Sequence, residues 1–282
     1  MKKILIIFIF SIFFIGCQEK QKEINLAVNE WIGYAPLFYA NEKGWLTQEN
    51  IKLIRTVSLA ESIKLYKNGL VKAFTSTQYE YLPLKNQVKP ILLLDKSYGG
   101  DMILSNTSIE KLKKAKKIDV YLEIDSVNSL LLSYFIKEYH ILAKLNFING
   151  DQEKLSQKSY DLSKPTIIVT YTPYDIIFQS KGFKIISSTK NDTNLLVIDA
   201  LFIDKNLNTN QFISLKKHLD KAIKEINQNP KQAYDLIENY YPTYSYKDFK
   251  EALGYIKWIN NPSKELIKEL NQINFDTKEL IK

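Results

Sequence analysis

Short apolar strand patterns alternate with amphipathic helix patterns along this chain, and that alternation limits its fold more than any other feature. "INLAV" at residues 24–28 predicts a buried strand, and the helix predicted over 34–43 ends at Gly44, the residue that a helix C-terminus prefers. Further strands are predicted at 51–57, 70–76 and 90–95, with helices at 60–69 and 78–84. This order predicts a parallel sheet covered by helices.

The same alternation starts again after residue 101. Strands are predicted at 101–106, 118–124, 165–171, 183–187 and 194–204, and helices at 108–117, 126–139 and 173–182. Ser126 is the expected N-cap of the second of these helices, and Pro173 is expected in the first turn of the third. From Asn208 onward the pattern is nearly all helical.

We therefore predict an α/β fold with two lobes. Residues 24–101 would form the first lobe, residues 102–198 the second, and residues 199–282 would return to the first lobe as a mostly helical region. The chain would cross between the lobes near residues 99–102 and again near 197–201. A single doubly wound sheet is the alternative. In open α/β sheets, ligands bind outside the carboxyl ends of the strands, so candidate residues are sought there.

The first residues look like an export signal. "MKK" gives a positive start, residues 4–16 form an uncharged apolar run too short to span a bilayer comfortably, and Cys17 is the only cysteine. A glycine directly before that cysteine resembles the lipobox of bacterial lipoproteins. The resemblance implies a signal peptide at 1–16, a lipid such as palmitate on Cys17 and a spacer at 17–23. Phe14 and Ile15 depart from the usual lipobox residues, so an uncleaved anchor is the alternative. A cleaved lipoprotein signal and an uncleaved anchor would both place the rest of the chain outside the cytoplasmic membrane.

The formal net charge of +8 raises the question of nucleic-acid binding. The lysines are spread out and cluster only at residues 111–117, so no basic and aromatic module pattern is present. His140 and His218 stand far apart, and no His or Cys spacing suggests zinc. The Walker, G-x-G-x-x-G and G-x-S-x-G motifs are missing. We therefore expect no metal, no cofactor, no nucleic-acid partner and no enzymatic activity.

Polar and aromatic side chains follow several of the predicted strands. Aromatic rings clasp planar or cationic ligands, and hydroxyls with free amides hold anions or carbonyls. The candidate ligand-binding residues are Trp31, Gly33, Tyr34, Thr75, Ser76, Thr77, Asp95, Asp101, Ser126, Asn128 and Tyr171.

Each of these groups has an alternative role. Core packing under the loop is the alternative for Trp31 and Tyr34, and a simple helix cap is the alternative for residues 75–77. Asp199 interrupts an apolar strand, where a carboxylate is costly unless it is bonded. We interpret Asp199 as a hinge residue bonded to backbone, with a partner for a cationic ligand as the alternative.

Five segments together carry a family resemblance. "WIGYAPLFYANEKGWL", "YKNGLVKAFTSTQYEYLPL", "LLLDKSYGGDMILSN", "VTYTPYDIIFQSKGFKIISS" and "LLVIDALFID" occur in the order seen in extracytoplasmic solute-binding proteins of ABC importers. The branch that this chain resembles is the aliphatic-sulfonate, nitrate and thiamine-pyrimidine binding group. "VKAF" at residues 71–74 departs from the usual "VDAA" of that family at Lys72.

The resemblance implies a two-lobed fold of the periplasmic-binding-protein type II kind. Each lobe would be a mainly parallel sheet flanked by helices, with the C-terminal helices packed back on the first lobe. Residues 31–34 would lie at the first cleft loop, residues 75–77 at the second, and Gly100–Asp101 at the first crossover.

The resemblance also implies binding and not catalysis. A monomer anchored through Cys17 would capture a small polar or heterocyclic ligand and deliver it to an ABC permease. Asp95, Asp101 and Glu123 favour a neutral or amine-bearing ligand over a sulfonate, whereas Arg55, the only arginine, keeps an anionic ligand open. A thiamine-pyrimidine-synthase-like enzyme is one alternative, against which the single cysteine argues. A sensory or scaffold lipoprotein is the other.

Overall fold

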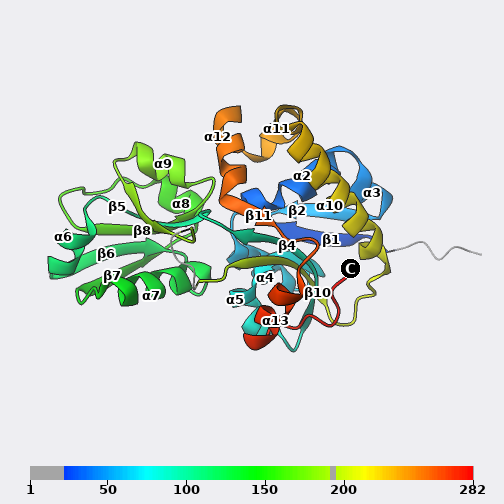
Figure 1. The fold of residues 1–282 in the computed structure, drawn as a ribbon, viewed down its shortest axis with the longest axis horizontal. Helices are drawn as coiled ribbons and strands as arrows, with labels where there is room; N and C mark the ends of the chain where they lie inside the picture. Colours follow the sequence, from blue (N-terminus) through cyan, green and yellow to red (C-terminus); the bar gives the residue numbers. More distant parts are fainter. Residues whose placement is uncertain (1–21, 191–194, 282) are drawn as a thin grey trace, which may run out of the picture.

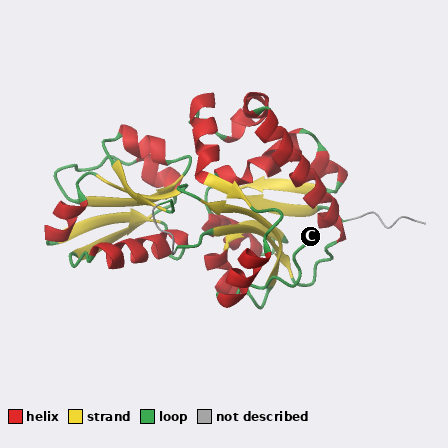
Figure 2. Ribbon diagram, viewed as in Figure 1, coloured by secondary structure: helices red, strands yellow, loops and turns green. Residues whose placement is uncertain are grey.

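The strands of this protein form two separate sheets (Figures 1 and 2). The computed structural model describes residues 22–190 and 195–281. One sheet consists, in spatial order, of β11 (Ile256–Trp258), β4 (Val88–Ser97), β10 (Ile198–Asp204), β3 (Ala73–Thr77), β1 (Ile24–Val28) and β2 (Ile51–Arg55). The other consists of β7 (Lys144–Asn149), β6 (Lys117–Leu122), β8 (Thr166–Tyr171), β5 (Asp101–Ser105) and β9 (Lys184–Ser188). We call the first sheet with its helices the first lobe and the second sheet with its helices the second lobe.

Helices cover both faces of each sheet (Figure 1). The second lobe contains α6 (Ile109–Lys114), α7 (Val127–Tyr139), α8 (Gln152–Gln157) and α9 (Asp175–Ser180). The first lobe contains η2 (Ile32–Tyr34), α2 (Ala35–Glu42), α3 (Trp45–Gln48), α4 (Leu59–Lys67), α5 (Gln78–Tyr81), η3 (Leu82–Leu84), α10 (Asn210–Gln228), α11 (Pro230–Ile237), η4 (Glu238–Tyr240), α12 (Tyr246–Ala252), η5 (Leu253–Tyr255) and α13 (Lys264–Gln272). The two-lobed α/β prediction is confirmed, and the single-sheet alternative is wrong.

Local signals in the sequence account for several element ends. β1 has the predicted bounds, and α2 ends before Gly44, which has a φ of 71°. Gly69, which follows α4, has a φ of 73°. Glycine adopts such left-handed backbone without steric cost, so both helices stop there. Ser126 caps α7 as predicted, because its hydroxyl accepts a hydrogen bond from the Asn128 N–H.

The sheets are not purely parallel, which the alternation pattern did not predict. β10 runs antiparallel to β3 and β4, and β5 runs antiparallel to β8 and β9. Each of these two strands begins just after the chain has crossed from the other lobe. β5 and β10 therefore run away from the space between the lobes, whereas the strands that are followed by a helix run toward that space.

Three further details differ from the sequence-based expectation. The three-residue strand β11 lies inside the tail predicted to be helical, and it pairs with β4 at the sheet edge. β7 and α8 lie in a region for which no element was predicted. Pro173 precedes α9 by two residues and so lies outside its first turn. β11 has only three residues, too few to show a period, and β7 is a largely exposed edge strand without a buried apolar run.

The two crossovers between the lobes are bonded to each other. The chain leaves the first lobe between β4 and β5, and it returns between β9 and β10. The hydroxyls of Ser97 and Thr189 are 2.8 Å apart across the two crossovers. The Gly99 N–H also donates to Thr189 Oγ1, at 2.8 Å. These bonds hold the two crossover segments side by side. The carboxyl ends of the parallel strands in both lobes face the space next to them.

The predicted leader and the lipidation site at Cys17 lie outside the described residues. Within residues 22–190 and 195–281, no helix combines the length and the apolar character needed to cross a membrane.

Candidate ligand-binding cleft

A small, nearly filled cavity of about 10 Å³ lies between the two lobes. Its lining consists of Asn29, Trp31, Tyr34, Leu59, Thr77, Asp101, Val127, Tyr171 and Asp199. Asn29 directly follows β1, Thr77 ends β3 and Tyr171 ends β8. The cavity thus lies at the carboxyl ends of strands from both lobes, where open α/β sheets bind ligands.

Three aromatic rings border the cavity, and each is held by a polar contact. The Trp31 indole N–H donates to Asp95 Oδ1 at 3.0 Å, and the Tyr34 hydroxyl donates to the Asp199 carboxylate. The Trp31 ring meets the Tyr171 ring of the second lobe edge to face, with 6.1 Å between centroids. All three rings are buried. All three therefore pack in the core, which was the alternative stated for Trp31 and Tyr34, and they also line the cavity.

Two glycines make this arrangement possible. A Cβ at Gly33 would lie 2.0 Å from Asp95 Oδ2, and a Cβ at Gly100 would lie 2.4 Å from Trp31 Cη2. Real atoms do not approach so closely. Gly33 therefore admits the Asp95 carboxyl, and Gly100 admits the indole ring that is bonded to it.

Three buried aspartates lie beside the rings. Asp95 and Asp199 are register partners on β4 and β10, and Asp101 is the first residue of β5. Burial raises the pKa of Asp101 to about 7 because the carboxylate loses its hydration. Burial likewise raises the pKa of Asp199, and the nearby charge of Asp95 raises it further. The Asp199 carboxylate is bonded to Tyr34, in contrast to the backbone bond expected of a hinge residue.

A buried glutamate connects the lobes. Glu80 forms the capping box of α5 with Thr77, whose N–H donates to Glu80 Oε2 at 3.2 Å. Its other oxygen, Oε1, accepts the Val127 N–H of the second lobe at 2.7 Å. Val127 is the first residue of α7, and the free N–H groups and dipole of a helix N-terminus favour a carboxylate. Thr77 is thus both a helix cap and a cavity residue.

Glu123 anchors a polar network behind the wall of the second lobe. Its Oε1 accepts from the Gln152 N–H at 3.1 Å and from the Tyr171 hydroxyl at 3.2 Å. The Asn128 amide oxygen accepts from Gln152 Nε2 at 3.1 Å, and the Ser126 hydroxyl donates to the Glu123 carbonyl at 2.8 Å. Burial raises the pKa of Glu123 to about 8. The network fixes the orientation of the Tyr171 ring at the cavity.

The structure was compared with known proteins. A scan against protein-family models and a search of curated proteins found no match. The ligand-binding component of an ABC-type import system from Staphylococcus aureus, solved with zinc bound, matches with a TM-score of 0.70 and 12% identity over 93% of this chain and 97% of its own. A Candida albicans protein described as having the generic periplasmic binding protein fold matches with a TM-score of 0.64 and 12% identity over 84% of this chain and 81% of its own. This chain has the periplasmic-binding-protein fold.

A third match agrees with that fold. The periplasmic aliphatic sulphonate binding protein SsuA from Escherichia coli aligns with a TM-score of 0.69 and 10% identity, over 91% of this chain and 86% of its own. The fold expected from the sequence resemblance is thereby confirmed.

Five of the predicted ligand-binding residues line the cavity of this binding-protein fold: Trp31, Tyr34, Thr77, Asp101 and Tyr171. The others lie behind its wall: Gly33, Thr75, Ser76, Asp95, Ser126 and Asn128. Four lining residues were not among the candidates: Asn29, Leu59, Val127 and Asp199. Asn29 could have been found because it directly follows a predicted strand, whereas Leu59 and Val127 are apolar and carry no such signal.

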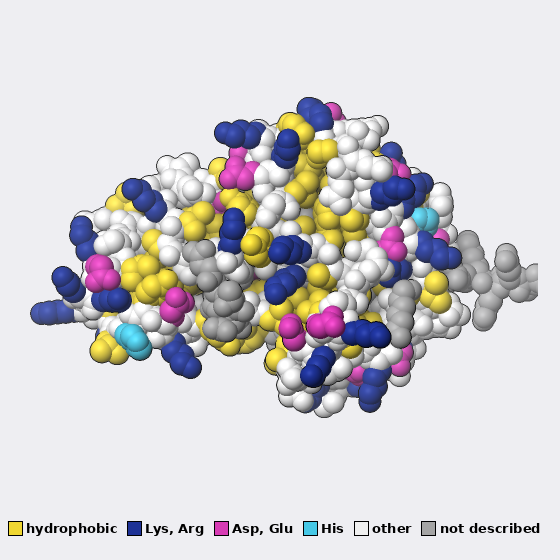
Figure 3. Space-filling model, viewed as in Figure 1, with side chains coloured by type: hydrophobic (Ala, Val, Ile, Leu, Met, Phe, Trp, Pro, Cys, Tyr) yellow, Lys and Arg dark blue, Asp and Glu magenta, His cyan; other side chains and the backbone are white. Residues whose placement is uncertain are grey.

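Arg55 does not line the cavity. Its guanidinium forms a 2.5 Å ion pair with Glu30 and lies 5.1 Å from the centre of the Tyr240 ring. In the part of the chain that the structure describes, no lysine, arginine or histidine lines the cavity. Figure 3 shows lysines and arginines scattered over the visible surface. Among the described residues, the charged side chains that line the cavity are thus the acidic Asp101 and Asp199.

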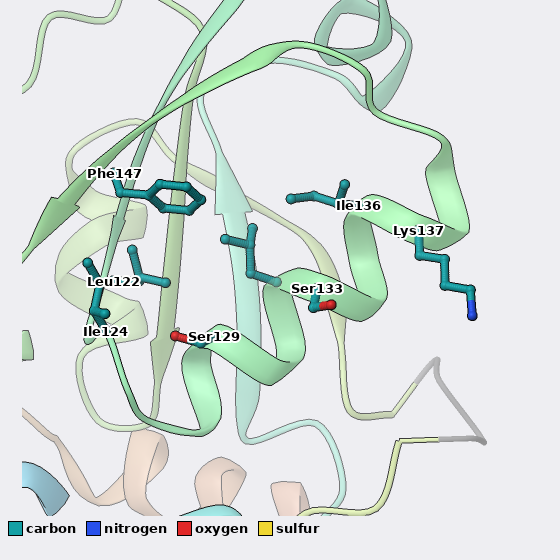
Figure 4. A pocket seen from close by; sticks show the side chains of 8 residues that line it. Leu122, Ile124, Ser129, Ser133, Ile136, Lys137 and Phe147 are labelled. Carbon is teal, nitrogen blue, oxygen red and sulfur yellow. The ribbon is translucent and has the colours of Figure 1, made fainter.

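A larger groove lies on the second lobe, away from the cleft (Figure 4). It is lined by Leu122, Ile124, Ser129, Leu132, Ser133, Ile136, Lys137 and Phe147. None of these side chains has a buried polar atom without a hydrogen-bond partner, in contrast to several residues at the cleft. The cavity between the lobes is therefore the better candidate for recognition of a polar solute.

Proposed function

We propose that this chain is the solute-binding component of an ABC import system. It captures a small polar or heterocyclic solute in the cavity between its lobes and delivers that solute to a membrane permease. The observation that carries the proposal is a cavity lined by Trp31, Tyr34 and Thr77 of the first lobe and by Val127 and Tyr171 of the second. The fold, which this chain shares with a ligand-binding component of an import system, supports it.

The proposed mechanism is closure of the lobes on the solute. The Glu80–Val127 hydrogen bond and the Trp31–Tyr171 ring contact exist only when the lobes are together. A solute drives closure only through contacts that it makes better in the closed state. We propose lobe boundaries at residues 24–101, 102–198 and 199–282, within one residue of the starts of β5 and β10, and recognition of the closed form by the permease. In this mechanism the protein binds its solute without chemical change.

We also propose that the protein is exported and anchored as a lipoprotein. Residues 1–16 would be removed, Cys17 would carry the lipid, and residues 17–23 would form a spacer that leaves a monomeric binding domain outside the cytoplasmic membrane. Cys17→Ala is expected to move the protein from the membrane fraction to the soluble fraction and to abolish labelling by radioactive palmitate. An unchanged distribution with unlabelled protein would contradict lipid anchoring.

Native mass spectrometry of gently purified protein, before and after unfolding and refolding, tests the binding function. A discrete adduct that is present before unfolding and lost afterwards would support a solute-binding protein and would give the mass of the solute. Thermal unfolding in the presence of a broad solute panel follows. If no adduct is found and no solute raises the unfolding midpoint, solute binding is contradicted, and a scaffold role becomes the better interpretation.

A further inference from the structure

The carboxylates around the cavity have no cationic partner in the described chain. Asp95, Asp101, Asp199, Glu80 and Glu123 are each at most 4% exposed. No lysine, arginine or histidine among residues 22–190 and 195–281 forms an ion pair with any of them. Buried charges in proteins are usually paired, because removing an unpaired carboxylate from water is costly. With a formal charge of +8, this chain has no shortage of cations that could have served.

The same region contains several hydrogen-bond acceptors that have no donor. Within the described residues, Asp101 Oδ2, Asp95 Oδ2, Glu123 Oε2 and Asn29 Oδ1 are buried and have no hydrogen-bond partner. Asp101 and Asn29 line the cavity directly, and Asn29 is only 2% exposed. A buried acceptor that lacks a donor destabilises the protein, because it has lost its hydrogen bonds to water. The site therefore suits a ligand that brings donors and positive charge, because a cation beside these carboxyls favours their ionised form.

The aromatic lining favours the same kind of ligand. The faces of tryptophan and tyrosine rings carry negative potential and attract cations within about 6 Å of the ring centre. Trp31, Tyr34 and Tyr171 all border the cavity. Aromatic rings and carboxyl groups from both lobes therefore surround one small cavity, and together they stabilise a positive charge there.

We propose that the solute is a small organic cation that carries N–H donors, such as a protonated amine, amidine or nitrogen heterocycle. Its charge lies between Asp101 and Asp199, against the rings of Trp31 and Tyr171. This inference rests on the proposed function, since it names the charge class of the solute that the cleft captures. The cavity of about 10 Å³ has room for no more than about one water molecule, so the lobes must move apart before the solute can enter.

An organic cation also fits this site better than a metal ion. In the described part of the chain, no group of three His, Cys, Asp or Glu side chains is arranged to hold a metal. The carboxylates are instead distributed around the cavity and bonded one by one to Trp31, Tyr34, Val127 and Tyr171.

The test uses probes that share a shape and differ in charge. Benzylamine, which is protonated at neutral pH, is compared with benzyl alcohol and benzoate. A panel of small amines, amidines and basic heterocycles is compared with ethanesulfonate, nitrate and zinc chloride. Thermal unfolding and calorimetry measure binding, and native mass spectrometry gives the mass of any co-purified solute. We expect stabilisation by cationic organic members of the panel, each binding at least about tenfold more tightly than its neutral counterpart.

The other outcomes separate this inference from the proposed function. Stabilisation by anions, neutral probes or zinc in place of organic cations would overturn the charge class and leave solute binding standing. No stabilisation by any probe, together with no co-purified solute, would overturn both.

A pair of charge variants locates the cation. Asp101→Asn keeps the size of the side chain and removes its charge, and it should weaken binding of the best cationic probe at least about tenfold. Glu110→Gln makes the same chemical change at a carboxylate on the surface of α6, whose side chain is 74% exposed, and should leave binding unchanged. Equal affinity in wild type and Asp101→Asn would overturn the placement of the charge at Asp101.

Discussion

Replacing Gly33 with alanine tests the close approach on which the wall of the cavity depends. The added Cβ would lie 2.0 Å from Asp95 Oδ2 and 2.2 Å from Asp95 Cγ. Non-bonded atoms normally keep about 3.5–4.0 Å, so the Asp95 carboxyl would have to move by more than an ångström. Asp95 is fully buried and has a short side chain, so it has little room to move. Its 3.0 Å hydrogen bond from the Trp31 indole would be lost.

Two effects contribute to the expected loss of stability. Overpacking of a well-packed site costs about 1–3 kcal/mol, and removal of a donor from a buried carboxyl costs about 1–3 kcal/mol more. Gly33→Ala should therefore lower the free energy of unfolding by roughly 2–6 kcal/mol. For a protein of this size, that corresponds to a midpoint lower by at least about 4 °C.

Thermal and urea unfolding followed by circular dichroism measure this loss. Gly254→Ala is the matched control, because nothing lies within 4 Å of a Cβ at that position. The control should change the free energy of unfolding by less than about 0.5 kcal/mol. If the two alanine variants unfold at the same midpoint, Asp95 is not held against Gly33, and the described wall of the cavity is wrong.

Further variants test three properties: the effect of buried Asp101 on stability, the closure of the lobes by Glu80, and the charge of the solute. Burial raises the pKa of Asp101 to about 7 in the folded protein, whereas the pKa of an aspartate in an unfolded chain is about 3.9. The protonated side chain therefore contributes to the free energy of unfolding fully below about pH 4, and this contribution is lost as the pH rises through about 7. Ligand-free Asp101→Asn should therefore be more stable than wild type at pH 8, by up to about 4 kcal/mol, and should gain little at pH 4; an equal difference at both pH values would exclude burial as the cause. Glu80→Gln keeps an acceptor for the Val127 N–H, whereas Glu80→Ala removes it. Small-angle X-ray scattering of the ligand-free proteins should therefore give the largest radius of gyration for Glu80→Ala. Identical scattering curves for wild type and both variants would show that Glu80 does not hold the lobes together. Arg55→Gln removes an exposed ion pair worth about 0–1 kcal/mol and should leave solute affinity unchanged in calorimetry, whereas a large loss would favour an anionic solute.

Local patterns in the sequence were sufficient to predict the general fold. Strand and helix periods, the stops at Gly44 and Gly69, and the cap at Ser126 depend on neighbouring residues only, and the structure contains each of them. The direction of β5 and β10 depends on where the chain comes from in space. A run of apolar residues carries no information about that direction.

The structure places some of the candidate strand-end residues at the cavity and others away from it. Trp31, Thr77 and Tyr171 follow or end predicted strands, and all three line the cavity. Gly33 was predicted as a ligand contact, but it lies where the Asp95 carboxyl needs space. In the sequence, a glycine that contacts a ligand cannot be distinguished from a glycine that leaves space for a neighbouring side chain. Only the position of the opposite strand distinguishes the two.

The sequence by itself determined the residue types, the strand ends and the two-lobed α/β organisation, because these follow from local periodicity and backbone preference. Only the tertiary structure decided which charges have partners. It places Asp95 beside Asp199, pairs Arg55 with Glu30, and leaves Asp101 facing the cavity without a cation. Whether a carboxylate is neutralised depends on side chains from distant segments that meet only on folding. The positive charge that we propose for the solute is therefore an inference from the folded cavity.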